Sequence, residues 1–196
     1  MLSLDGFRWD YAGKTETPNL DKIAQSGVKA ESLQACFPTK TFPNHYTIAT
    51  GLYPDNHGIV NNSFYAPDLD RYYFIRNRDA VGDSAFYGGE PIWVTAEKQG
   101  VKTASLFWVG SEAPVKGIRP SMWKQYNHNL PFEQRIDTVM AWLNLPKPQR
   151  PHLILWYLHE PDAVGHNHGP EGKKTLKTIR YLDSLVGVFY QKLQQL

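Results

Sequence analysis

Three segments of the chain carry the side chains that phosphoester hydrolysis needs. Asp5 follows a short apolar run, residues 38–46 read PTKTFPNHY, and residues 160–166 read EPDAVGH with Asp162 among them. Together they supply a hydroxyl nucleophile, two carboxylates and an imidazole, the groups found in metal-assisted phosphoester hydrolases. The sequence therefore predicts chemistry on phosphate.

The last of these segments has the composition of a metal site. Asp162 and His166 lie four residues apart, and Gly165 and Gly169 let a loop curl so that both side chains reach one cation. Carboxylate and imidazole ligands favour zinc or manganese over calcium. A histidine-rich loop that is only solvated is the alternative, and the spacing does not choose between the two.

Two threonines qualify as the nucleophile. A metal ion or a base can convert the hydroxyl of either Thr39 or Thr41 into an attacking alkoxide. Pro43 suits the first turn of a helix that runs to about Thr50, which puts Thr41 at the N-terminus of that helix. Free N–H groups there favour a bound phosphate, whereas the simpler reading is that one threonine caps the helix.

The elements that must position these residues alternate along the chain. Apolar runs predict strands over residues 1–4, 28–35, 101–108 and 152–158, and helical spacing predicts helices over residues 18–24, 43–50, 91–99, 132–143 and from 174 onward. Residues 51–62 are expected to be a loop, and residues 63–78 a small hairpin insertion at the surface. This order predicts an α/β fold with a mainly parallel sheet flanked by helices. Ligands bind beyond the carboxyl ends of such strands, where Asp5 and Asp162 lie.

The length, composition and net charge of the chain indicate which kind of molecule the protein binds. With 196 residues, 41% hydrophobic and 20% charged, one globular domain is expected. The formal charge of +2 is too small for a nucleic-acid polymer or an anionic membrane partner, so a small-molecule substrate is expected. No apolar run is long enough for a membrane segment, and the single Cys36 is expected to be buried. Both ends look cut, because the chain opens in an apolar strand and closes in a helical pattern.

These motifs together resemble one enzyme family. The resemblance rests on five segments: SLDGFR at residues 3–8, PTKTFPNHY at 38–46, TGLYP at 50–54, HGIVNN at 57–62, and EPD with GH and GP over 160–170. They are similar to the nucleotide pyrophosphatase/phosphodiesterases, relatives of autotaxin in the alkaline phosphatase superfamily. The resemblance implies an alkaline-phosphatase-like fold in which residues 1–196 form part of a catalytic domain, truncated at both ends.

The resemblance also implies roles. Thr41 would be the nucleophile, held on one zinc ion with Asp5, while Asp162 and His166 would bind a second zinc ion. The residues implied at the substrate are Phe42 and Tyr126, which would sandwich a nucleobase, Asn62, which would hold a phosphoryl oxygen, and Trp108. The implied reaction cleaves nucleotide phosphodiester or pyrophosphate bonds through a phosphothreonine and releases a nucleoside monophosphate. The family is mostly periplasmic, extracellular or displayed at the cell surface.

The chain departs from the family pattern in its ligand count. That pattern includes an Asp-His pair followed by Gly and a later separate His, and neither occurs after Gly172. Four ligands for two zinc ions are few, because zinc sites generally use three or four ligands each. We therefore expect these 196 residues alone to be inactive or weakly active, and residues 174–196 to present an apolar face without a partner.

Two alternatives stay open. One is a phosphomonoesterase or another member of the same superfamily, although its sulfatase branch uses Cys or Ser where this chain has Thr41. The other is a non-catalytic module that binds a nucleotide or a metal ion. Monoester against diester hydrolysis distinguishes the first, and metal content distinguishes the second.

Overall fold

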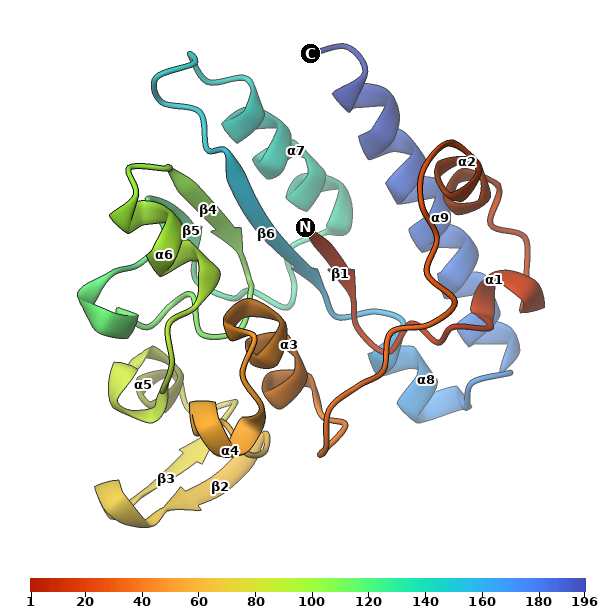
Figure 1. Cartoon of the computed structure of the whole chain (residues 1–196). Coiled ribbons are helices and arrows are strands. Elements are labelled where there is room, and N and C mark those ends of the chain that lie inside the picture. Colours follow the sequence, from red (N-terminus) through yellow and green to blue (C-terminus); the bar gives the residue numbers. More distant parts are fainter. The chain divides into compact units, whose positions relative to one another are not determined.

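The computed structural model describes residues 1–196, and its main sheet has four strands (Figure 1). The strand order is β1 (Leu2–Leu4), β6 (Leu153–Leu158), β4 (Thr103–Leu106) and β5 (Met122–Lys124). Strand β4 runs parallel to both β5 and β6, with Leu106 opposite Lys124 on one side and Trp156 on the other. A separate antiparallel hairpin joins β2 (Ser63–Ala66) to β3 (Arg71–Phe74). The predicted α/β class, with a mainly parallel sheet and a small hairpin, is confirmed.

The chain divides into two compact units. The first contains residues 35–127 and 146–156 together with Met1, and the second contains residues 2–34, 128–145 and 157–196. The α-helices of the first unit are α3 (Thr41–Thr50), α4 (Pro54–His57), α5 (Arg78–Gly82) and α6 (Ile92–Lys98). Three short 3₁₀ turns lie at Pro67–Leu69, Ser84–Phe86 and Val115–Gly117. The helices of the second unit are α1 (Tyr11–Lys14), α2 (Pro18–Ser26), α7 (Phe132–Leu143), α8 (Asp162–His168) and α9 (Lys173–Leu193).

Aromatic side chains dominate the core of the first unit. Tyr46 of α3, Trp93 of α6 and Tyr73 of β3 are fully buried, and all four residues of β4 are buried. Tyr73 stacks on Phe64 across the hairpin at a centroid distance of 5.0 Å. The hydroxyl of Tyr73 also lies 2.7 Å from that of Tyr87. One face of the hairpin therefore belongs to the core, while the opposite face is exposed.

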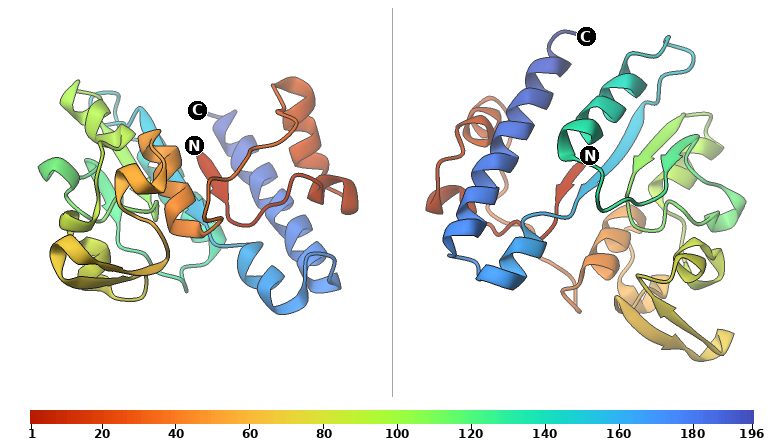
Figure 2. Two further views of the ribbon diagram at one scale, coloured as in Figure 1. Left: turned by 60° about the horizontal axis from the view of Figure 1, so that its bottom comes forward. Right: turned by 180° about the vertical axis from the view of Figure 1, so that it is seen from behind.

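Helix α9 organises the second unit. Its buried stripe consists of Thr175, Ile179, Leu182, Asp183, Leu185, Val186 and Gly187. Helix α9, the long blue helix in Figure 2, lies against α2, α7 and α8. The expectation that residues 174–196 present an apolar face without a partner is wrong, because these helices cover it.

A buried carboxylate joins α9 to the start of α2. Asp183 accepts hydrogen bonds from the backbone N–H groups of Asn19 and Leu20 at 3.1 and 2.8 Å. These are N–H groups of the first helical turn, which have no partner within the helix. Thr17 occupies the N-cap position, as predicted, but its side chain makes no capping hydrogen bond. Asp183 provides the acceptor for these N–H groups instead.

Several local predictions are wrong. Residues 28–35 form irregular chain that pairs with no strand, and Val28 is 100% exposed. The expected loop over 51–62 contains the short helix α4. Strand β5 was not predicted, because its three residues are too few to show a period.

Cys36 is buried, as expected. No helix combines the length and the apolar character that crossing a membrane requires.

Candidate active site

In the first unit, Thr41 begins helix α3. The N-cap residue is Lys40, and its side chain makes no capping hydrogen bond. Thr39 lies outside the helix and is exposed, whereas Thr41 is half-buried at the first helical position. Thr41 thus lies at the N-terminus of α3, where backbone N–H groups and the positive end of the helix dipole favour an anion.

The amide of Asn62 lies beside this helix start. Its Oδ1 accepts a hydrogen bond from the backbone N–H of Phe42 at 3.0 Å. Because an N–H can be accepted only by the amide oxygen, this bond determines which end of the amide faces the helix. The Nδ2 group, with its two N–H donors, is then directed to the other side. Asn62 is thus held as a hydrogen-bond donor next to the residue that follows Thr41.

Two further side chains hold the first turn of α3 in place. The Nδ1 of His45 lies 2.8 Å from the carbonyl oxygen of Thr41, which requires that Nδ1 carry the proton. The indole N–H of Trp108 donates to the carbonyl of His45 at 3.1 Å, and the two rings meet edge to face. Trp108 is buried, so it lies beneath α3 in the core.

The chain that leads into Thr41 is bound by Asn44. The Oδ1 of Asn44 accepts from the backbone N–H of Cys36 at 2.8 Å, and its Nδ2 lies 3.0 Å from the carbonyl oxygens of both Pro38 and Lys40. One side chain therefore fixes the backbone of three residues that precede the helix. Such bonds between a side chain and nearby backbone are the usual way in which Asn orders irregular chain.

The two predicted base-stacking aromatics each rest on another aromatic ring. Phe42 meets Tyr73 edge to face at 6.1 Å, and Tyr126 meets Phe107 edge to face at 5.3 Å. Both Phe42 and Tyr126 are half-buried, so part of each ring stays accessible. Edge-to-face packing against a buried partner restricts the rotation of each ring.

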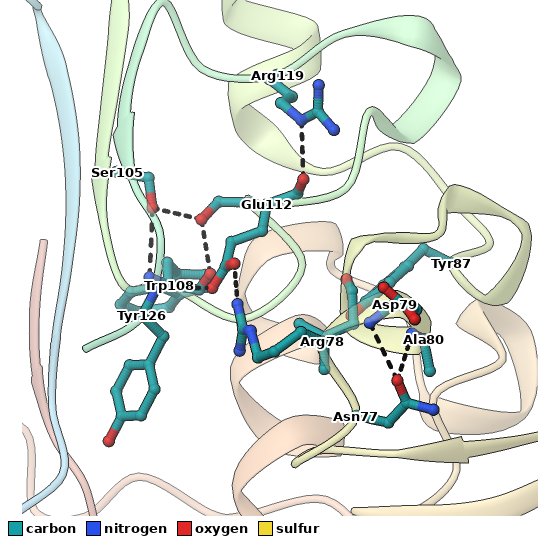
Figure 3. Close-up of polar contacts among 12 residues, drawn as sticks. Asn77, Arg78, Asp79, Ala80, Tyr87, Ser105, Trp108, Glu112, Arg119 and Tyr126 are labelled. Atoms are coloured by element: carbon teal, nitrogen blue, oxygen red, sulfur yellow. Dashed lines mark hydrogen bonds and ion pairs between the residues drawn. The ribbon is translucent and has the colours of Figure 1, made fainter. Parts of the chain in front are cut away.

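A buried carboxylate that the sequence did not single out supports Tyr126 (Figure 3). Glu112, 9% exposed, accepts the backbone N–H of Tyr126 on Oε1 at 3.0 Å and pairs with Arg78 through Oε2. Its carbonyl oxygen accepts from Nε of Arg119 at 2.8 Å. Figure 3 shows the Tyr126 ring extending away from this carboxylate. No sequence pattern marks Glu112, because its partners lie 14 and 34 residues away.

In the second unit, Asp5 and Asp162 lie side by side. The backbone N–H of Asp5 donates to the carbonyl of Leu158 at 2.9 Å, and the N–H of Asp162 donates to the carbonyl of Asp5 at 2.9 Å. Gly6 follows with a φ of +66°, and a Cβ there would lie 2.9 Å from the Cα of Asp162. Only glycine combines that conformation with such a close approach. The sequence prediction that both carboxylates follow strands is confirmed.

Asp162 and His166 share one turn of α8. The predicted loop is therefore a helix, in which an i, i+4 spacing places the two side chains on one face. The Oδ1 of Asp162 lies 3.4 Å from Nε2 of His166. Two ligands each about 2.0–2.1 Å from a tetrahedral zinc ion are about 3.4 Å apart, so the separation of this pair is compatible with a shared ion. Neither unit gathers three or more His, Cys, Asp or Glu side chains around one point.

A neighbouring histidine belongs to a different cluster. His159 stacks on His128 at a centroid distance of 4.1 Å, and its Nδ1 lies 3.5 Å from a guanidinium nitrogen of Arg135. Burial is the largest cause, and together with the electrostatic effect of His128 and Arg135 it lowers the pKa of His159 to about 4. The ring of His159 therefore packs in an aromatic and cationic group that is separate from the Asp162 and His166 pair.

The parallel sheet, the flanking helices and the hairpin define an alkaline-phosphatase-like α/β protein. Murine ectonucleotide pyrophosphatase/phosphodiesterase 5 superposes with a TM-score of 0.94 over 99% of this chain and 51% of that one, at 33% sequence identity. The human counterpart matches with the same score and coverage. The predicted fold is confirmed by this similarity.

The family model for type I phosphodiesterase / nucleotide pyrophosphatase matches residues 1–196, and the chain belongs to this family. It is 41% identical over 198 residues to human ectonucleotide pyrophosphatase/phosphodiesterase family member 1 and 42% identical over 197 residues to venom phosphodiesterase 2 of Crotalus adamanteus. Each alignment covers 100% of this chain, but only 21% and 24% of the two relatives. The chain thus spans about a quarter or less of these curated relatives.

Proposed function

We propose that this chain supplies part of the active site of an enzyme that hydrolyses nucleotide phosphodiester or pyrophosphate bonds, with Thr41 as the nucleophile. The observation that carries the proposal is the environment of Thr41, at the first position of α3 beside an Asn62 amide whose donors are turned away from the helix. An anionic phosphoryl group is favoured at such a helix start. An inactive threonine-to-alanine variant of the murine relative was solved in complex with AMP, which supports a threonine nucleophile and a nucleotide substrate here.

The proposed reaction has two displacements. In the first, the Thr41 Oγ–P bond forms, the P–O bond to the leaving group breaks, and the hydroxyl proton passes to the leaving oxygen. In the second, the oxygen of a water molecule bonds to phosphorus, the Thr41 Oγ–P bond breaks, one proton of the water passes to Oγ, and a nucleoside monophosphate is released. Asn62 donates hydrogen bonds to a phosphoryl oxygen through both steps, and such fixed donors stabilise charge as it develops.

Metal dependence is part of the proposal. Asp162 and His166 fit one zinc ion by their 3.4 Å separation, and Asp5 and Thr41 are the proposed ligands of the second ion. When bound, zinc neutralises the charge that develops on phosphoryl and leaving oxygens. Because four ligands are few for two ions, we expect slow turnover from residues 1–196 alone.

The remaining assignments concern the nucleotide. We propose that Phe42 and Tyr126 stack on the base, since each presents part of a ring whose orientation is restricted by a buried partner. For Trp108 we propose a positioning role under α3 in place of direct contact, because it is buried and bonded to His45. We propose an extracellular or cell-surface location, because the relatives are named as ectoenzymes and as venom enzymes.

The test compares the two threonines. The chain, with zinc present, is incubated with the p-nitrophenyl ester of thymidine 5′-monophosphate, and nitrophenolate release is measured for the parent, Thr41→Ala and Thr39→Ala. We expect zinc-dependent release, slow but measurable, that Thr41→Ala abolishes and Thr39→Ala retains, because Thr39 is exposed outside the helix. Mass spectrometry of the quenched parent is expected to show a nucleotidyl adduct at residue 41.

Equal activity of the Thr41→Ala variant and the parent would refute the nucleophile assignment. Preference for p-nitrophenyl phosphate over the diester would favour the phosphomonoesterase alternative. Zinc binding without any adduct or release would favour the non-catalytic module.

A further inference from the structure

A buried tyrosine binds the carboxylate of Asp5. The hydroxyl of Tyr157 lies 2.8 Å from Oδ2 of Asp5, and the two residues are only 8% and 9% exposed. A carboxylate can only accept, so the tyrosine hydroxyl is the donor. A hydrogen bond to a charged acceptor is stronger than a neutral one, and its burial strengthens it further.

The buried hydroxyl of Tyr157 needs a hydrogen-bond partner. Tyr157 lies in β6 between Trp156 and Leu158, and all three residues are buried. A buried hydroxyl without a partner costs free energy, so a tyrosine here depends on a nearby acceptor. The acceptor is an acidic side chain 152 residues away in the sequence.

The backbone around Asp5 is already fixed. Its N–H is bonded to Leu158, its carbonyl is bonded to the N–H of Asp162, and Gly6 allows the close approach of these segments. The Cα and Cβ of Asp5 are therefore held, and rotation about the side-chain torsions is the main freedom left to the carboxylate. The bond from Tyr157 to Oδ2 restricts that rotation.

We propose that Tyr157 is a positioning residue, which holds the Asp5 carboxylate in the orientation needed to bind a metal ion. The inference rests on the proposed function, in which Asp5 is a metal ligand. Ligating carboxylates are themselves hydrogen-bonded in metal sites, and loss of such an outer partner typically weakens metal binding by about 10-fold to 100-fold.

The test is the zinc affinity of Tyr157→Phe, measured by competition with a chromophoric chelator at constant pH. We expect binding to weaken by roughly 10-fold to 100-fold relative to the parent. The matched control is Tyr73→Phe, which also removes a buried hydroxyl from a hydrogen bond, but in the first unit. The control is expected to keep the parent's zinc affinity, while urea unfolding of the metal-free proteins shows whether each variant is folded.

Three comparisons of zinc affinity distinguish a failure of the positioning role from a failure of the proposed metal site. Zinc affinity of Tyr157→Phe equal to that of the parent would overturn the positioning role. Zinc affinity of Asp5→Asn equal to that of the parent would overturn Asp5 as a ligand, and with it the proposed metal site. A loss in Tyr157→Phe matched by an equal loss in Tyr73→Phe would also overturn the inference, since it would reflect stability alone.

Discussion

Removal of the Glu112 carboxylate tests how the base-stacking aromatic is held. The substitution Glu112→Ala deletes the acceptor of the Tyr126 N–H and the ion-pair partner of Arg78. The matched variant Glu112→Gln has nearly the same shape and keeps an amide oxygen for the Tyr126 N–H. The pair of variants therefore separates the hydrogen bond from the negative charge.

The expected magnitudes follow from the contacts. A hydrogen bond to a charged group contributes about 1.5–3 kcal/mol, and the carboxylate of Glu112 accepts one from Tyr126 and one from Arg78. The Arg78 side chain is 36% exposed and regains water when its partner is lost, so the two contributions do not add fully. We expect Glu112→Ala to lower the free energy of unfolding by about 2–4 kcal/mol, and Glu112→Gln by about 1 kcal/mol.

The functional assay is the preference for AMP over ribose 5-phosphate, two ligands that differ by the base. Stacking on an aromatic side chain contributes enough to change binding by roughly 5-fold to 100-fold per base. Titration calorimetry should show that Glu112→Ala loses most of the parent's preference for AMP, because the Tyr126 backbone is no longer anchored. Glu112→Gln should keep that preference within about 2-fold, since it still accepts the N–H.

Two outcomes would refute this reasoning. A folded Glu112→Ala variant that keeps the full AMP preference would show that Tyr126 needs no anchor or does not stack. A Glu112→Gln variant as impaired as Glu112→Ala would show that the charge, rather than the hydrogen bond to Tyr126, is what matters.

Two further predictions concern stability in the second unit. Asp183→Ala should lower the free energy of unfolding by about 2–4 kcal/mol, because it removes a charged acceptor from the first turn of α2. The control Asp137→Ala breaks only an exposed ion pair with Lys192 and should change the free energy of unfolding by less than about 1 kcal/mol. Urea unfolding followed by tryptophan fluorescence measures both variants. A similar small effect of both would contradict the capping role. Because the folded pKa of His159 is about 4 and its ordinary value is 6.5, the unfolded chain binds more protons between these values, so stability should fall as pH is lowered from about 7 towards 4. His159→Gln should flatten this part of the profile, and an unchanged slope would contradict the assignment.

Elements with a strong period could be predicted from the sequence. Residues 132–143 show apolar side chains at helical spacing, and α7 has these bounds. The same holds for the apolar stripe of α9. These patterns arise from the geometry of one element burying one face, so the sequence alone carries them.

Elements without a period, or with misleading composition, could not be predicted. Residues 28–35 contain strand-forming side chains, yet no neighbouring strand pairs with them and they stay irregular. Gly165 suggested a loop, whereas the segment from Asp162 to His168 is helical. In both cases the surroundings of the segment override its local preference, as is usual for short segments.

The order of motifs along the chain determined by itself the fold class, the family resemblance and the identity of the candidate reactive side chains. The tertiary structure alone decided how those side chains are held: which way the Asn62 amide faces, that Glu112 anchors Tyr126, and that Tyr157 binds Asp5. The physical reason is that residue types and their spacing report local geometry, while a buried polar group takes its partner from whichever distant segment packs against it.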